Sequence, residues 1–202
     1  MNRRWRFRLS LACAALTALV ASAAIAHSAS DAYLTLEAPV RAVPGTGRST
    51  VLHGQWDIAL RDLHFVLGLD DDGDGNITWG EVRRHQAAIA RYAYASLRVS
   101  GDGKACTVTP TRQAVADHAD GAYSALFFDI TCADAPKRLA LDYRLFFAVD
   151  PSHRGIFVLH SGAGTATALL SPDNARIELP IQKTVAATNA RIGRASNERS
   201  VP

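Results

Sequence analysis

The stretch LHGQWDIAL, residues 52–60, alternates in polarity and would place one set of side chains on a common face: Leu52, Gly54, Trp56, Ile58 and Leu60. Residues 33–38 alternate in the same way, and the turn-rich sequence PGTG, residues 44–47, lies between the two runs. A period of two over runs of this length is typical of β-strands with one buried face. We therefore expect the domain to begin with a β-hairpin.

Two helical segments follow this hairpin. The alternation ends over residues 61–69, where Leu63, Val66 and Leu67 have the spacing of one helical face, and residues 79–97 form an Ala- and Arg-rich run. The segment between them is acidic. We expect two helices of unequal length that flank a loop, as an insertion at about residues 61–97 between the second and third strands.

Strand patterns resume after residue 98 and are separated by turn-forming residues. The expected strands cover residues 105–109, 123–132, 138–149, 155–160, 165–171 and 175–179. Asp129, Asp142 and Asp150 are expected at solvent-facing strand positions. Several short strands at this spacing favour an antiparallel β-sandwich. The predicted fold class is mainly β with an α insertion: an antiparallel β-sandwich-like domain over residues 27–182.

The first 26 residues have the composition of a secretory signal peptide. Four arginines precede an uncharged stretch over residues 9–26, which ends in Ala24-Ile25-Ala26. We expect cleavage before His27. Cleavage after Ala23 and an uncleaved anchor remain as alternatives, because the apolar length is borderline for a bilayer. The mature protein is then expected to be soluble, in the periplasm or secreted.

Residues 183–202 contain few large apolar side chains, and we expect them to form a flexible tail. A short amphipathic helix that becomes ordered on a partner or an anionic surface is the alternative. The whole chain has a formal charge of +3, but the four N-terminal arginines and the basic tail leave residues 27–182 at about −4. This balance excludes the basic footprint of a nucleic-acid-binding protein.

The composition is that of an ordinary globular domain. With 48% hydrophobic and 20% charged residues, it excludes a collagen-like, a wholly disordered and a polytopic membrane protein.

After removal of the signal sequence, Cys106 and Cys132 are the two remaining cysteines. An even pair in an oxidising compartment is typical of a disulfide. Such a crosslink would stabilise the fold by roughly 3 to 4 kcal/mol in the chain-entropy model. Two buried free thiols are the alternative, because the sequence does not reveal their Cα separation.

The segment DDDGDGNITWGE, residues 70–81, places oxygen-bearing side chains at alternate positions, as a loop around a cation requires. Calcium takes about six to eight oxygen ligands. The expected ligands are carboxylates of Asp70, Asp72 and Asp74, the backbone carbonyl of Asn76, Thr78 directly or through water, and both oxygens of Glu81. Gly75 permits the sharp turn, and Ile77 should point away from the ion into a core.

On these positions, residues 61–91 resemble an EF-hand calcium-binding protein. The resemblance implies a helix–loop–helix unit with bound Ca²⁺. His85 and Gln86 stand where sensor EF-hands usually have apolar residues, and the sequence has no second such loop. We therefore expect a structural or interaction role instead of a calmodulin-like opening. Pairing of loops between two copies and a solvated acidic turn without an ion remain as alternatives.

The wider chain resembles the exported N-terminal portion of HupE/UreJ-family proteins. The segments concerned are SDAYL (30–34), GQWDIALRDL (54–63), DYRLF (142–146) and DPSHRG (150–155). In that family the exported portion precedes a membrane part associated with nickel or cobalt uptake. A polar tail stands in that place here, so the resemblance implies a periplasmic module that acts beside a membrane-protein partner, without a transport role of its own.

An accessory metal-handling role is the alternative function. If cleavage exposes His27, its amino group and ring, together with His153 or His160, would suit copper or nickel. The sequence HSGAG, residues 160–164, has the outline of a nucleophile elbow, but Leu159 replaces the leading glycine. We expect no enzymatic activity. The leading expectation is an exported calcium-binding protein with one site.

Overall fold

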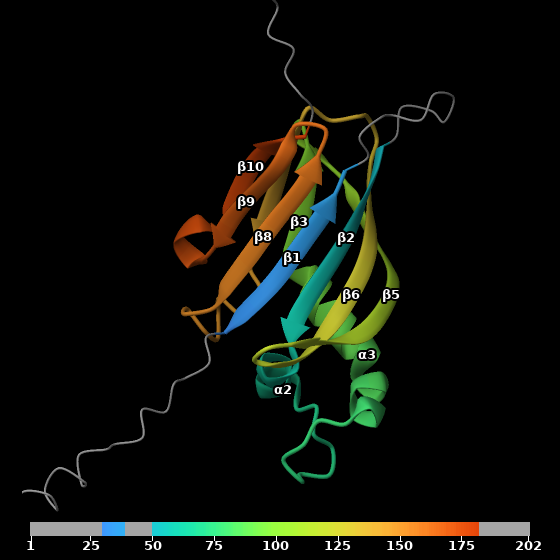
Figure 1. Ribbon diagram of the computed structural model, residues 1–202, viewed down its shortest axis with the longest axis vertical. Coiled ribbons are helices and arrows are strands. Elements are labelled where there is room, and N and C mark those ends of the chain that lie inside the picture. Colours follow the sequence, from blue (N-terminus) through green and yellow to red (C-terminus); the bar gives the residue numbers. More distant parts are fainter. Residues whose placement is uncertain (1–29, 39–49, 182–202) are drawn as a thin grey trace, which may run out of the picture.

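Two β-sheets and two α-helices make up the part of the chain that the structure, a computed structural model, describes: residues 30–38 and 50–181 (Figure 1). The segments predicted as signal peptide and flexible tail lie outside these residues. The helices are α2 (Leu60–Leu67) and α3 (Trp79–Ala95), and η1 (Pro172–Asn174) is a 3-10 turn. The strands are β1 (Asp31–Glu37), β2 (Thr50–Ala59), β3 (Leu97–Gly101), β4 (Lys104–Ala105), β5 (Thr107–His118), β6 (Gly121–Cys132), β7 (Arg138–Tyr143), β8 (Arg154–Ser161), β9 (Gly164–Leu170) and β10 (Arg176–Pro180).

The strands form a larger sheet in the order β5-β6-β2-β1-β8-β9 and a smaller one in the order β10-β7-β3-β4. The smaller sheet lies behind the larger one in Figure 1, and both helices lie at one end of the pair. The helical segment is inserted between β2 and β3. The prediction of a mainly β domain with an α insertion is confirmed.

Alternation along the strands gives the two sheets a shared core. Leu34 and Trp56 of the larger sheet are fully buried in one cluster with Leu141 of the smaller sheet. The face predicted within residues 52–60 is buried throughout. Gly54 is required on this face, because a Cβ there would lie 2.3 Å from the ring of Phe128.

One strand pair differs from the antiparallel expectation. β1 pairs antiparallel with β2 but parallel with β8, from Asp31 opposite Arg154 to Glu37 opposite His160. Both strands start beside α2, because residues 144–153 bring the chain to that end of the sandwich before β8 (Figure 1). Parallel and antiparallel strands have the same period of two, so the sequence pattern does not distinguish them.

The strand expected over residues 138–149 ends at Tyr143. Residues 145–149 form turns instead, and Phe146 adopts the left-handed conformation with φ +58°. The N–H groups of Val149 and Asp150 both donate to Phe146 O, at 2.8 and 2.7 Å. Asp150 therefore lies in a turn and not at the strand position that the sequence suggested.

Two further boundaries differ from those expected. β5 continues to His118, well past residue 109, because it pairs with β6 along its whole length around a register shift between Pro110 and Arg112. α3 ends at Ala95, and the following residues form β3, which pairs with β7. Long-range pairing decides both boundaries.

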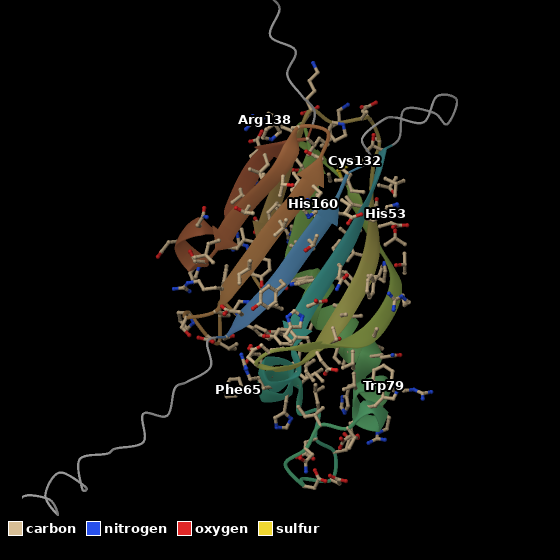
Figure 2. The ribbon with its side chains drawn as sticks, in the orientation of Figure 1. His53, Phe65, Trp79, Cys132, Arg138 and His160 are labelled. Atoms are coloured by element: carbon tan, nitrogen blue, oxygen red, sulfur yellow. A yellow bond between two sulfur atoms is a disulfide. The ribbon has the colours of Figure 1, made fainter. Side chains whose placement is uncertain are left out.

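The predicted disulfide between Cys106 and Cys132 is present, with 4.4 Å between the Cα atoms. The N–H of Cys106 donates to Val99 O of β3, whereas Cys132 ends β6, so the crosslink joins the two sheets. Figure 2 shows Cys132 at the end of the sandwich opposite Phe65 and Trp79, which belong to the helices. Within the described residues, no helix is both long enough and apolar enough to cross a membrane.

Candidate metal centre

The acidic segment over residues 70–81 forms the loop between α2 and α3, at the tip of the molecule (Figure 1). Carboxylate oxygens of Asp70, Asp72 and Asp74 all lie within 4.8 Å of one another. Three negative charges at this spacing repel one another, and a cation between them would remove that repulsion. The structure therefore brings together three of the expected ligands.

Backbone N–H groups hold these carboxylates in place. The two carboxylate oxygens of Asp70 accept from the N–H groups of Gly73 and Gly75, at 2.8 and 2.9 Å. Asp74 Oδ1 accepts from the Asn76 N–H at 2.7 Å. These bonds curl the chain around Asp70. Gly75 has φ +84°, a conformation that a side chain with a Cβ disfavours.

Glu81 does not belong to the group of three converging carboxylates. Its side chain, which is 2% exposed, caps α3. Oε2 accepts from both the N–H and the O–H of Thr78 at 2.7 Å, and Oε1 accepts from the Asp71 N–H at 2.8 Å. These hydrogen bonds lower the pKa of Glu81 to about 2, and the bond from the Thr78 hydroxyl contributes most. Glu81 is therefore an ionised carboxylate held at the exit of the loop.

The other expected residues lie on the same loop. Thr78 is the N-cap of α3, and its Oγ1 accepts from the Glu81 N–H at 3.3 Å, which completes a capping box. Asn76 is exposed, and Ile77 is half-buried against the core. Through Ile77 the loop packs against the hydrophobic core that the helices share with the sandwich.

Asp71 is a loop residue that the sequence did not single out, and it ties the loop to α3. Arg84 Nε–H donates to Asp71 Oδ2 at 2.7 Å, and His85 Nε2 lies 2.8 Å from Asp71 Oδ1. These contacts lower the pKa of Asp71, and the hydrogen bond with His85 contributes most. The polar residue His85 thus has a partner in the loop itself.

His64 closes the other end of the loop. Its Nδ1 accepts from the N–H groups of Leu69 and Asp70, at 3.0 and 3.3 Å, beyond the last turn of α2. Gly68, with φ +61°, ends the helix in the left-handed conformation. The helical run was expected over residues 61–69, whereas α2 ends at Leu67 because Gly68 leaves the helical conformation. The role of His64 depends on the course of the loop, so the sequence did not indicate it.

A second group of polar side chains lies inside the protein, beside α2. Tyr143 OH lies 2.7 Å from His153 Nε2, and His153 Nδ1 lies 2.7 Å from Ser30 Oγ. The Ser30 O–H donates to Asp62 Oδ2 at 2.9 Å. We call these four residues the buried chain. Burial lowers the pKa of His153 to about 4, so its ring is neutral at pH 7.

The proton positions in the buried chain follow from Asp62. The Ser30 hydroxyl has a single hydrogen and donates it to Asp62 Oδ2, so Ser30 Oγ accepts from His153 Nδ1–H. Nε2 of the neutral ring then accepts from the Tyr143 O–H. Ser30 receives a hydrogen bond from histidine, whereas the serine of a Ser-His-Asp triad donates one. This order does not activate Ser30 as a nucleophile.

Of the histidines considered for copper or nickel, the two that the structure describes have other hydrogen-bond partners. Both ring nitrogens of His153 are engaged in the buried chain, and His27 lies outside the described residues. His160 Nδ1 lies 3.0 Å from Thr165 Oγ1 on the neighbouring strand. Residues 160–164 end β8 and lead into β9, a strand–turn–strand connection without the helix of a nucleophile elbow.

The acidic loop offers carboxylate, hydroxyl and carbonyl oxygens, which are donors for a hard cation. Among the described residues, no other group of three His, Cys, Asp or Glu side chains brings its donor atoms as close together. No protein-family model matches the sequence of this chain, and no curated protein matches it either.

Proposed function

We propose that the protein is an exported calcium-binding module in which the loop over residues 70–81 binds one Ca²⁺ as a single EF-hand. The observation that carries the proposal is the convergence of Asp70, Asp72 and Asp74 in a loop whose backbone already curls around Asp70. Calcium fits this donor set because it accepts many oxygens in flexible geometry, while magnesium requires a tighter octahedron.

Glu81 and Asn76 would complete the ligand shell. Glu81 is ionised and lies at the first turn of α3, where a rotation of its side chain would exchange the hydrogen bonds to Thr78 and Asp71 for the ion. Asn76 would contribute its backbone carbonyl. Because Glu81 belongs to α3 and Asp70 follows α2, the bound ion would connect the two helices through the loop.

A bracing role is the best supported use of the ion. The loop contacts the core through Ile77 and α3 through Asp71, so an ion there would fix both helices against the sandwich. Without it, the charges of the loop oppose closure. The disulfide and the signal-like sequence of residues 1–26 support export to an oxidising compartment. The resemblance to the exported portion of HupE/UreJ-family proteins supports a membrane-protein partner.

Calorimetry and thermal unfolding of the processed chain, with mass spectrometry to identify its first residue, test this proposal. Exported calcium modules have dissociation constants of about 10⁻⁴ to 10⁻³ M. At tenfold excess over such a constant, calcium should stabilise the protein by about 1.4 kcal/mol, which raises Tm by about 3 to 6 °C.

Asp70→Asn and Glu81→Gln should abolish this response, and Asp173→Asn, at an exposed aspartate in η1, should keep it. Absence of binding at millimolar calcium, or an unchanged affinity in Asp70→Asn, contradicts the proposal. Parallel titrations with Cu²⁺ and Ni²⁺ decide against the metal-handling alternative if neither ion binds under the conditions in which calcium does.

A further inference from the structure

A pocket of about 240 Å³ lies beside α2, separate from the acidic loop. It is bounded by the residue before β1, by α2 and by the turns that follow β7. The residues that line it are Ser30, Asp62, Phe65, Phe146, Val149 and Asp150. Figure 2 shows Phe65 on the side of α2 away from α3.

The volume of this pocket limits its occupant. Sites for cofactors and drug-sized ligands usually measure about 300 to 1,000 Å³. The present pocket is smaller, so it suits one amino-acid side chain better than a whole cofactor.

The charged groups in the lining are two carboxylates. Asp62 has a side chain only 17% exposed, and burial raises its pKa, with a smaller contribution from the charge of Asp150. Arg61 contacts Asp62 at 3.4 Å, but its Nη1 extends to Asp120 at 3.2 Å. Arg154 Nη1 donates to three backbone carbonyls of the preceding turn. Because Arg61 is shared between Asp62 and Asp120, it offsets the two lining carboxylates only in part, and the pocket presents a net negative charge to its occupant.

The walls are apolar and incompletely covered. Phe65 is 77% exposed and Val149 is 49% exposed, which is unusual for such large apolar side chains in one place. Phe146 is buried at the base with φ +58°, and its ring centroid lies 5.0 Å from that of His153. A non-glycine residue in this conformation is strained, and such strain is concentrated at ligand sites.

We infer that this pocket binds one arginine side chain of a partner protein, with the guanidinium between Asp62 and Asp150 and the alkyl stem against Phe65 and Val149. Arginine fits better than lysine because its planar group can donate to two carboxylates and stack on an aromatic ring. None of the lining residues belongs to residues 70–81, so the inference stands apart from calcium binding.

NMR titration of the full processed chain with N-acetyl-arginine amide tests the inference, in calcium and again in chelator. Amide shifts should saturate in residues 62–65 and 146–150 with a roughly millimolar dissociation constant. The citrulline analogue, which has the same shape without the charge, should bind at least tenfold more weakly, and the lysine analogue should bind severalfold more weakly.

Asp62→Asn and Asp150→Asn should each weaken binding at least fivefold, and Phe65→Ala severalfold, with Asp173→Asn unchanged. Asparagine keeps an acceptor for the Ser30 hydroxyl, so Asp62→Asn should fold. The inference is overturned if the amide shifts do not saturate at probe concentrations up to 20-fold above about 1 mM. It is also overturned if the citrulline analogue binds as tightly as the arginine probe.

The basic tail of this chain is the competing occupant. If replacement of Arg191, Arg194 and Arg199 by glutamine strengthens probe binding severalfold, the tail fills the pocket and a partner arginine is the wrong assignment. If the affinity does not change, the pocket is open to a partner. Loss of the calcium response without loss of arginine binding would contradict only the proposed function.

Discussion

The acidic loop and the buried chain are both built from polar side chains, but their hydrogen bonds are distributed differently. The loop takes its carboxylates from 12 consecutive residues, and most of them are exposed. The buried chain takes one residue each from the position just before β1, from α2, from β7 and from the turn before β8. The first is local in sequence, whereas the second exists only because the sandwich folds.

This difference has an energetic consequence. The charges of the acidic loop are neutralised only in part by Arg84, so the loop has free energy to gain from a cation. In the buried chain each of the four polar side chains has a hydrogen-bond partner, and His153 is neutral. The loop should respond to metal, and the buried chain should respond to pH and to the integrity of the fold.

Removal of the disulfide should have the largest effect and should separate the two regions. In Cys106→Ala/Cys132→Ala, the free energy of unfolding should fall by about 3 to 4 kcal/mol, because the crosslink closes a long loop of the unfolded chain. The calcium affinity should stay within about twofold, since the loop lies at the opposite end of the molecule (a twofold change is about 0.4 kcal/mol). Urea unfolding and calorimetry measure the two quantities. A parallel loss of both would show that the regions are coupled.

Acidification should have the second-largest effect on stability, and it should act through His153 of the buried chain. The pKa of His153 is about 4 in the folded protein and 6.5 as a free side chain. Between these values the unfolded chain binds more protons, so stability should fall as pH decreases, by about 3 kcal/mol from pH 7 to pH 4. Above pH 7 this contribution is constant. Urea unfolding of the wild type and of His153→Gln across this range isolates it, and parallel curves would contradict the assignment.

Tyr143→Phe should cost about 2 kcal/mol, because it leaves the buried Nε2 of His153 without its donor while the ring remains in the core. Tyr92→Phe, at a half-buried tyrosine of α3 outside the buried chain, is the matched control and should change little. Equal losses in the two variants would mean that the hydrogen bond to His153 contributes nothing specific.

Gly75→Ala should have the smallest effect, about 1 kcal/mol, because a Cβ is unfavourable at φ +84°. The cost should appear mainly as calcium binding that is roughly fivefold weaker. Gly80→Ala is the control, since a Cβ there meets only ordinary contacts in the first turn of α3. Calorimetric titration compares the two variants, and the prediction fails if both bind calcium equally.

Much of the fold could be predicted because its signals are short-range. The alternation over residues 52–60 predicted the buried face of β2, and turn residues marked most strand ends. The strand expected through Val149 was wrong, because Phe146 enters the left-handed region, which its neighbours in sequence do not indicate. The parallel pairing of β1 with β8 was missed because it depends on the route of residues 144–153.

The candidate metal site divides in the same way. The spacing of Asp70, Asp72 and Asp74 was sufficient to predict their convergence, since a turn with Gly73 and Gly75 brings alternate residues together. The partners of Asp71 were not predictable, because Arg84 and His85 approach it only after α3 turns back along the loop.

The sequence by itself determined the features that depend on neighbouring residues: the strand periodicity, the acidic loop and a helical segment on each side of that loop. It also indicated the cysteine pair, because two cysteines leave one pairing. Only the tertiary structure decided that Ser30, Asp62, Tyr143 and His153 form one chain of hydrogen bonds, and that Phe65 and Asp150 border one pocket. Contacts between distant segments carry no local periodicity, and they form only when burial of the core brings those segments together.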